Sequence, residues 1–390
     1  MEPTNPIEAV THRDPYPYYA RLLAGPPIYF DEELRLWVAA RATMVSEVFA
    51  SQACRVRPVA EPVPAALDGL PAGEIFSHLV RMNDGSRHDQ PKLALERALA
   101  AIPTSEVEVR ARHAATRAVL PSLEPAALNA WVFNTPIAAV SNLLGFSGDE
   151  QSAIVEWTRQ FVACLSPLST PEQLSTAGAA AALLRSRMHA LLDSIDPDSD
   201  NLISSVRDQA ASVGWVDTAS IVANLIGVLS QTYEATAGLI ANAIVALARQ
   251  PTLLGDVRVL TDGWGQLVHE TSRYDSPVQN TRRFVVEPTT ISGVELVPGA
   301  VVLLVLAAAN RDPHANPDPE RFRLERPDRC VFSFSRGAHA CPGEAVARTV
   351  AAAALSALFD AVPDDALATL AWTYKPSTNG RLPIFHNAIP

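Results

Sequence analysis

The chain has 390 residues and a formal net charge of −11, which excludes nucleic acid and anionic membranes as its main partners. Hydrophobic residues make up 48% of the sequence, enough for a large core, so a disordered chain is excluded. The four cysteines form no C-x-x-C pair, which excludes a disulfide framework or a zinc finger and favours a reducing, cytoplasmic location.

The N-terminal part of the sequence predicts short elements followed by a loop. Its first residues lack the positive and apolar segments of a signal peptide, and no apolar run reaches about 18 residues, so we expect neither a leader nor a membrane anchor. We expect a short helix through Leu23, a hairpin at 28–30 and 36–39, and a helix at 42–50. Residues 55–80 are rich in proline and alanine and predict a long loop, either functional or a solvated connector.

Residues 92–260 have a predominantly helical pattern. Ser105 is expected to be an N-cap, and 169–172 combines a capping box with a proline before a helix at 174–192. The apolar stretch 218–248 predicts one helix of about thirty residues, roughly 45 Å long, that crosses the core. Its polar interruption contains Glu234, whose burial is costly unless the carboxylate is used chemically or paired with a neighbouring helix.

The pattern changes to short strands after residue 275. Strands are expected at 281–286, 289–291, 294–296 and 300–305, then a turn-rich segment at 310–322, a helix at 344–359 and paired strands within 368–388. We therefore expect one domain covering residues 1–390, mainly α with a small β-rich part.

The most specific chemical signal is the segment 334–343, which has the pattern F-x-x-G-x-H-x-C-x-G. Cys341 precedes a predicted helix, and a helix N-terminus favours a thiolate, which serves as a nucleophile or a metal ligand. Pairing with His339 as a catalytic base is poor geometry, because residues two apart on a tight loop rarely face each other. Glu270 and Arg273 share a helical face, and an ordinary surface ion pair is the alternative explanation for them.

This segment resembles the haem-binding loop of the cytochrome P-450 superfamily, the haem–thiolate monooxygenases. Glu270 with Arg273, the segment 274–279 followed by Arg283, the segment 308–313 and the segment 319–322 also fit that family, in order and in spacing. The resemblance implies the cytochrome P-450 fold, with haem b held between the long central helix and the helix that follows the cysteine loop.

The resemblance also implies roles for individual residues around the haem. Cys341 would be the proximal iron ligand, with Phe334 near the sulfur, and Gly337 and Gly343 would allow close approach of the backbone. The implied structural triad is Glu270, Arg273 and Arg321. The implied propionate partners are His88, Lys92, Arg283 and His339. Lys92 stands where the family has arginine, and Ser335 where it usually has glycine.

The sequence departs most from the family in the central helix. Residues 231–235 align with the family pattern A-G-x-acid-T, so Glu234 keeps the acid, whereas Thr232 replaces the glycine and Ala235 the alcohol. The candidates for the catalytic set are Glu234, Gln231, Thr232 and Thr236, the last about 100° further around the helix. Three explanations remain open: a water or substrate hydroxyl replaces the alcohol, Gln231 or Thr232 supplies a polar group, or the chemistry needs no ordinary dioxygen scission.

The resemblance implies an oxidoreductase, a bacterial monooxygenase that oxidises a small to mid-sized, partly polar organic substrate of secondary metabolism with dioxygen. Electrons would come from a separate ferredoxin or flavodoxin and its reductase, docking on the basic residues Arg87, Lys92, Arg97 and Arg348, and a monomer is expected. Expected substrate contacts lie at 60–82 and 377–379 and include Val228, Val278, Asn280 and Thr378. The alternatives are a peroxide-driven or oxidative-coupling haem–thiolate enzyme and a non-catalytic haem-binding protein.

Overall fold

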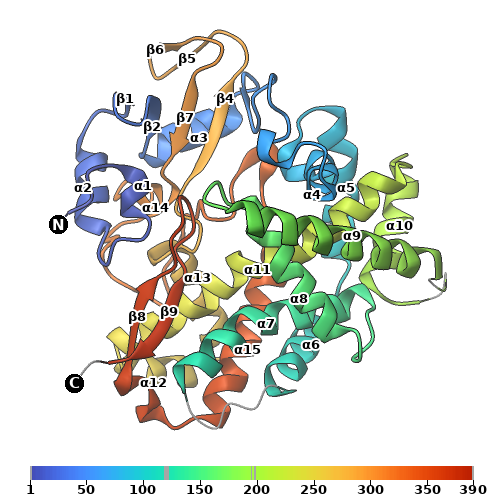
Figure 1. Cartoon of the computed structure of the whole chain (residues 1–390). Helices are drawn as coiled ribbons and strands as arrows, with labels where there is room; N and C mark the ends of the chain where they lie inside the picture. The colour runs from blue at the N-terminus through green and yellow to red at the C-terminus, as the bar shows by residue number, and fades with distance from the viewer. Residues whose placement is uncertain (1, 118–122, 195, 197–198, 389–390) are drawn as a thin grey trace.

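One long helix, α11 (Thr218–Arg249), runs through the middle of the molecule, and most other helices pack around it (Figure 1). The computed structural model describes residues 2–117, 123–194, 196 and 199–388. The Asp217 carboxylate caps α11 by accepting a hydrogen bond from the Ser220 backbone N–H at 3.2 Å. The predicted central helix is therefore confirmed, within one residue at its C-terminal end.

The two halves of α11 belong to different parts of the core. Residues 221–233 pack with α4, α5 and α8–α10, whereas residues 237–247 pack with α7, α13 and α15. The residues between these clusters, 234–236, lie within the polar interruption of the sequence, which covers residues 230–238. The remaining helices of eight or more residues are α2 (Tyr16–Ala24), α3 (Ala42–Ala50), α4 (Pro71–His78), α5 (Ser86–Ala100), α6 (Thr104–Arg117), α7 (Pro125–Leu144), α8 (Gln151–Val162), α9 (Pro171–Ser194), α10 (Leu202–Ser212), α12 (Thr252–Val259), α13 (Gly263–Tyr274) and α15 (Glu344–Ala361).

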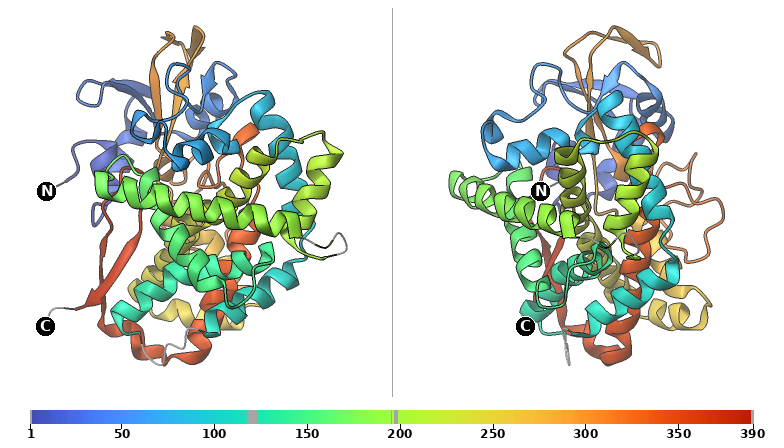
Figure 2. Two further views of the ribbon diagram at one scale, coloured as in Figure 1. Left: turned by 45° about the vertical axis from the view of Figure 1, so that its right-hand side comes forward. Right: turned by 90° about the vertical axis from the view of Figure 1, so that its right-hand side faces the viewer.

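A five-stranded sheet lies beside the N-terminal helices, at the top of Figure 1 and in both views of Figure 2. Its order is β1 (Ile28–Asp31), β2 (Leu36–Ala39), β7 (Val301–Leu304), β4 (Thr281–Val285) and β3 (Cys54–Arg55). The hairpin β1–β2 is antiparallel, and β2 then pairs in parallel with β7, which joins the N-terminal and C-terminal parts of the chain. The predicted strands β5 (Thr289–Ile291) and β6 (Val294–Leu296) form a second hairpin, and β8 (Leu370–Tyr374) and β9 (Pro383–Asn387) a third.

Three local predictions are wrong. The stretch 55–80 contains α4, because Pro71 occupies the first turn of a helix, where a missing N–H costs nothing, and Ile75 and Phe76 are buried below it. Helix α6 begins at Thr104, so Ser105 lies inside it and is not an N-cap. The capping box of α9 is formed by Thr170 and Gln173, which exchange hydrogen bonds of 2.9 and 3.2 Å, one residue later than expected.

Arg381 ties the two ends of the chain together. Its side chain is fully buried and donates to the Asp275 carboxylate at 2.7 Å and to the carbonyls of Val10 and His12 at 3.1 and 2.7 Å. Among the described residues, no single helix is long and apolar enough to span a membrane; α11 and α12 meet the conditions of length and composition only together, as a pair bent by 117°.

Candidate active site

The loop that carries Cys341 leads into α15 and is held by backbone contacts. The Cys341 N–H donates to the Phe334 carbonyl at 2.7 Å, and the short helix η4 (Gly337–His339) lies between them. Gly337 has φ +66°, and a Cβ there would lie 3.3 Å from the Phe49 carbonyl oxygen, so this position requires glycine. Ser335 has φ +59°, which explains why glycine is the ordinary residue at that position.

Cys341 differs from the buried Cys54 and Cys164 because its side chain is exposed. Burial by surrounding protein nevertheless raises the pKa of the Cys341 thiol, although the Gly343 backbone N–H and Lys92 lower it. The backbone at the helix N-terminus thus favours the thiolate, as expected, but in the free thiol burial outweighs this contribution. A bound metal cation would overcome this burial cost, because coordination deprotonates a thiol outright.

Four cationic or titratable side chains gather beside this loop. His88 and Lys92, on α5, and Arg283, on β4, are buried, with exposures of 4%, 6% and 6%. The His88 and His339 rings lie 4.3 Å apart between centroids. His339 Nε2 lies 3.0 Å from the Asp84 carboxylate, and the Lys92 ammonium donates to the Ala340 carbonyl, next to Cys341.

This set fits the haem that the resemblance implies. Arg283 donates to the Arg282 carbonyl at 2.9 Å, and within the described part of the chain no carboxylate forms an ion pair with it. Burial lowers the pKa of Arg283 to about 10, and a buried guanidinium without a counter-ion is costly. A haem propionate would supply that counter-ion, and the exposed Cys341 sulfur would supply the iron ligand.

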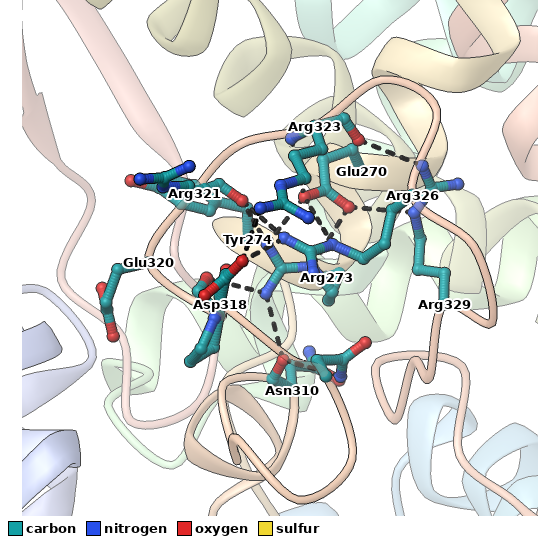
Figure 3. Close-up of polar contacts among 12 residues, drawn as sticks. Glu270, Arg273, Tyr274, Asn310, Asp318, Glu320, Arg321, Arg323, Arg326 and Arg329 are labelled. Carbon is teal, nitrogen blue, oxygen red and sulfur yellow. Dashed lines mark hydrogen bonds and ion pairs between the residues drawn. The ribbon is translucent and has the colours of Figure 1, made fainter.

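A buried charge cluster stabilises the segment between α13 and the cysteine loop (Figure 3). Glu270 and Arg273, both fully buried, form an ion pair at 2.7 Å. Arg273 also donates to the carbonyls of Asn310 and Pro319 at 3.2 and 3.0 Å. Burial raises the pKa of the Glu270 carboxyl, but the hydrogen bond and charge of Arg273 outweigh it, so the pKa lies below its usual range.

The prediction that the Arg321 side chain is the third member of this cluster is wrong. The Arg321 side chain points away from Glu270, and Arg321 contributes its backbone carbonyl, which accepts from Arg273 at 3.2 Å (Figure 3). Two arginines that the sequence analysis missed contact the carboxylate instead: Arg326 at 3.2 Å and Arg329 at 2.9 Å. The available signal was the density of arginines in 321–329, but spacing alone does not show which of them turn inward.

The accessible positions in the middle of the central helix are Glu234 and one narrow stripe. Val228, Thr232 and Ala235 are partly exposed and Gln231 is exposed, while Leu229, Ser230 and Tyr233 are buried. These four positions have the i, i+3, i+4, i+7 spacing of one helical face. We call Val228, Gln231, Thr232 and Ala235 the α11 stripe.

Only two of the four predicted catalytic residues belong to this stripe. Gln231 and Thr232 lie on it, although the Thr232 hydroxyl donates back to the Val228 carbonyl at 2.8 Å. Thr236, one turn after Thr232, is only 1% exposed, so its role as a catalytic residue stays a prediction. Glu234 forms an ion pair at 2.6 Å with Lys375, which follows β8. The residue at the position of the family alcohol, Ala235, therefore faces the accessible side without a hydroxyl.

The predicted substrate contacts also separate into two groups. Val228, Val278 and Thr378 are partly exposed. Asn280 is 3% exposed, and its amide donates to the Thr378 carbonyl at 2.9 Å. Its prediction as a substrate contact is therefore wrong, because its amide holds the tip of the C-terminal hairpin.

One of the four residues expected to contact an electron donor, Lys92, does not lie on the surface. It is buried, as described above, whereas Arg87 and Arg97 on the same helix are exposed and Arg348 is partly exposed. An arginine outside these predictions, Arg81 in the short helix η2 (Val80–Met82), is exposed near the α11 stripe.

Comparisons with known proteins point to one family. The cytochrome P-450 family model matches residues 265–361. The chain is 29% identical to the cytochrome P-450 monooxygenase PikC of Streptomyces venezuelae, over 94% of this chain and 89% of that protein. It is 30% identical to the 6-deoxyerythronolide B hydroxylase of Saccharopolyspora erythraea, over 58% of this chain and 56% of that protein. The crystal structure of CalO2 has a similar fold, with a TM-score of 0.83, 24% identity and full coverage of both chains.

Proposed function

The chain belongs to the cytochrome P-450 family of haem-dependent monooxygenases, and from this premise we propose that it oxidises a small to mid-sized organic substrate held against the α11 stripe. The substrate of such an enzyme is a small molecule, and its electrons come from a redox partner. We further propose that residues 1–390 act as one domain and a monomer, that the cofactor is haem b, and that the electron donor is of the ferredoxin or flavodoxin type with its reductase.

The observation that carries the proposal is the combination of an accessible Cys341 thiol and a buried Arg283 that forms no ion pair among the described residues. When bound through a cysteine sulfur, haem activates dioxygen, and donation from the thiolate favours O–O cleavage. Cys341 would hold the iron, and Arg283, His88, Lys92 and His339 would hold the propionates.

The chain's own residues prepare this site in three ways. The Lys92 contact with the Ala340 carbonyl and the Phe334 contact with the Cys341 N–H fix the position of the thiol. The Glu270 cluster holds the segment that leads to the loop. On the opposite side, the α11 stripe offers a mixed apolar and amide surface to the substrate, in keeping with a partly polar molecule of secondary metabolism.

The identity of the cofactor is tested by the spectrum of the reduced protein under carbon monoxide. The purified wild-type protein should bind haem and show the difference spectrum of a thiolate-ligated haem, and Cys341→Ala should lose it. Cys164→Ala, which removes a buried thiol outside the cysteine loop, is the matched control. A wild-type protein that is colourless, or a Cys341→Ala variant with the same spectrum as the wild type, would contradict the proposal.

The alternative proposal is peroxide-driven or oxidative-coupling chemistry, and the alanine on the α11 stripe favours it. Ala235 cannot donate a proton, and Thr236, the next hydroxyl along the helix, is buried. Turnover with a ferredoxin, its reductase and NADH supports the monooxygenase. Turnover with hydrogen peroxide, combined with none through redox partners, supports the alternative.

A further inference from the structure

The segment that carries Arg81 is fixed against α11 at the beginning of the stripe. The Asn224 side chain on α11 accepts from the Val80 N–H at 2.8 Å and donates to the His78 carbonyl at 2.8 Å. One turn later Gly227 leaves room for this segment, because a Cβ at Gly227 would lie 3.0 Å from the Leu79 side chain. Helix η2 therefore lies directly beside Val228, the first residue of the α11 stripe.

Arg81 combines two properties that rarely coincide. Its side chain is exposed. Burial nevertheless lowers the pKa of Arg81 to about 10, with Glu234 opposing this effect. Arg81 is therefore accessible and also lies close enough to α11 for the Glu234 carboxylate to act on its charge.

The local charges leave Arg81 without a close counter-ion. Glu234 acts on Arg81 at a distance, but its hydrogen-bonded partner is Lys375, at 2.6 Å. Throughout the described ranges, no carboxylate forms an ion pair with Arg81. Beside the stripe there are thus two cations and one carboxylate, and that carboxylate is already paired. A desolvated guanidinium with free donors is a strong site for a planar anion.

We propose that Arg81 anchors a carboxylate of the substrate, so that the enzyme oxidises organic acids whose apolar body lies along the α11 stripe. The inference rests on the proposed function and adds the chemical class of the substrate. Arg81 is thereby a specificity-determining residue. Lys375 supports it indirectly, because it holds the Glu234 carboxylate that would otherwise compete for Arg81.

The inference is tested with the haem-loaded enzyme and matched probes that differ only in charge. Dodecanoate, cinnamate and naphthylacetate are each titrated against their primary amides, and the substrate-induced shift of the haem absorption is followed. At least one acid should bind the wild type roughly tenfold or more tightly than its amide, because a hydrogen bond to a charged group contributes about 1.5–3 kcal/mol.

Three variants locate the effect at Arg81. Arg81→Gln should reduce the preference for the acid to about twofold or less and leave the affinity for the amide nearly unchanged, whereas Arg81→Lys should keep part of it. Lys375→Gln should weaken binding of the acid, because Glu234 is then free to approach Arg81. Arg185→Gln, which removes an exposed charge that pairs with Glu74 on the outer surface, is the control and should bind both probes like the wild type.

Two outcomes overturn the inference without touching the proposed function. One is a wild type with the full thiolate–haem spectrum that binds no acid more tightly than its amide. The other is an Arg81→Gln variant that loses haem, which would place Arg81 among the propionate partners. Failure of the proposed function looks different, since the wild type itself would lack the thiolate–haem spectrum.

Discussion

The backbone of Ser335 is strained, at a position where the family usually has glycine. The residue adopts φ +59°, a conformation that costs a non-glycine residue about 1–2 kcal/mol. Its hydroxyl is also buried without a hydrogen-bond partner among the described residues. The sequence shows that serine replaces the usual glycine, and the structure shows that this replacement is strained.

Replacing Ser335 by glycine should therefore stabilise the protein. We expect the free energy of unfolding to rise by about 1 kcal/mol, because strain is relieved and an unpaired hydroxyl is removed. The measurement is urea unfolding followed by circular dichroism. Ser333→Gly is the matched control and should be destabilising, because the Ser333 hydroxyl accepts from Asn310 at 2.9 Å. A destabilised Ser335→Gly variant would show that the angle is not strained.

Whereas Ser335 destabilises its position, the Glu270 carboxylate is the shared counter-ion of three arginines. The carboxylate, fully buried, contacts Arg273, Arg326 and Arg329, and all three lose their counter-ion if it is neutralised. Removing one partner from a buried ion pair typically costs about 3–5 kcal/mol. Glu270→Gln should therefore lower the free energy of unfolding by about that amount, with loss of bound haem.

The measurement for Glu270→Gln is urea unfolding together with haem content per chain. Glu325→Gln is the control, because Glu325 lies on the same segment but is exposed and should tolerate the change. A Glu270→Gln variant as stable as this control would mean that the cluster contributes no net stability.

At the scale of whole elements, α11 shows which features periodicity can predict and which it cannot. The long apolar run predicted its length within one residue at the C-terminal end, because an uninterrupted helical pattern has few other solutions. The pattern did not show which face of the polar interruption is accessible. The accessible face depends on how α4, η2 and the C-terminal hairpin pack against the helix. The sequence of α11 alone does not determine those contacts.

The position of Ala235 on the α11 stripe leads to a prediction for Ala235→Thr. The added hydroxyl would face the accessible side, so the product formed per NADH with redox partners should rise by roughly twofold or more; a well-placed proton donor contributes factors of about a hundred or more. Turnover with hydrogen peroxide should change little. Threonine in a helix interior costs a few tenths of a kcal/mol, so the fold should persist.

Thr236→Ala is the control for this experiment, because it removes a hydroxyl that is buried. It should leave the product formed per NADH unchanged. If Thr236→Ala lowers that ratio and Ala235→Thr does not raise it, the hydroxyl of Thr236 reaches the reaction after all and the assignment of the stripe is wrong.

The whole molecule should lose stability in mild acid, because several groups are buried in their less protonated form. Burial, with Arg348 and Arg329 nearby, lowers the pKa of His269 to about 3, against an ordinary value near 6.5. Between these values the unfolded chain binds a proton that the folded chain does not, so stability falls as pH drops below about 6.5. The depressed pKa of Glu270 acts only below its ordinary value of about 4.5.

The window between pH 5 and pH 6.5 therefore reports on buried histidines and not on Glu270. His269→Gln should flatten the fall of the unfolding temperature in this window, while leaving a part due to His339, whose pKa is also lowered by burial. The measurement is thermal unfolding at a series of pH values. His113→Gln, on the outer helix α6, is the control. An unchanged slope in His269→Gln would show that His269 is protonated in the folded protein.

The sequence predicted the fold class, the central helix, the strands after 275 and the cysteine loop, because these rest on periodicity or on a dense motif. It failed where side-chain direction decides the outcome: Arg321 against Arg326 and Arg329, Asn280 at the hairpin tip, and Lys92 in the interior. Arg81 lies within 60–82, a segment expected to contact the substrate, but no sequence pattern singles it out there. A proline-rich stretch gives no indication that one arginine within it lies beside the central helix.

The buried Arg381 also governs when the protein can complete its fold during synthesis. Its bonds to Val10 and His12 join residues 371 and 369 positions apart, and β2 likewise pairs with β7 across more than 250 residues. At about 5–20 residues per second, the ribosome needs roughly 20–80 seconds to make this chain. During nearly all of that time the N-terminal segment has no native partner, and the exposed edge of β2 is open to pairing with other chains. The emergence of Arg381 from the ribosome, and not the emergence of the central helix, is thus the moment at which the N-terminal segment gains its native partner.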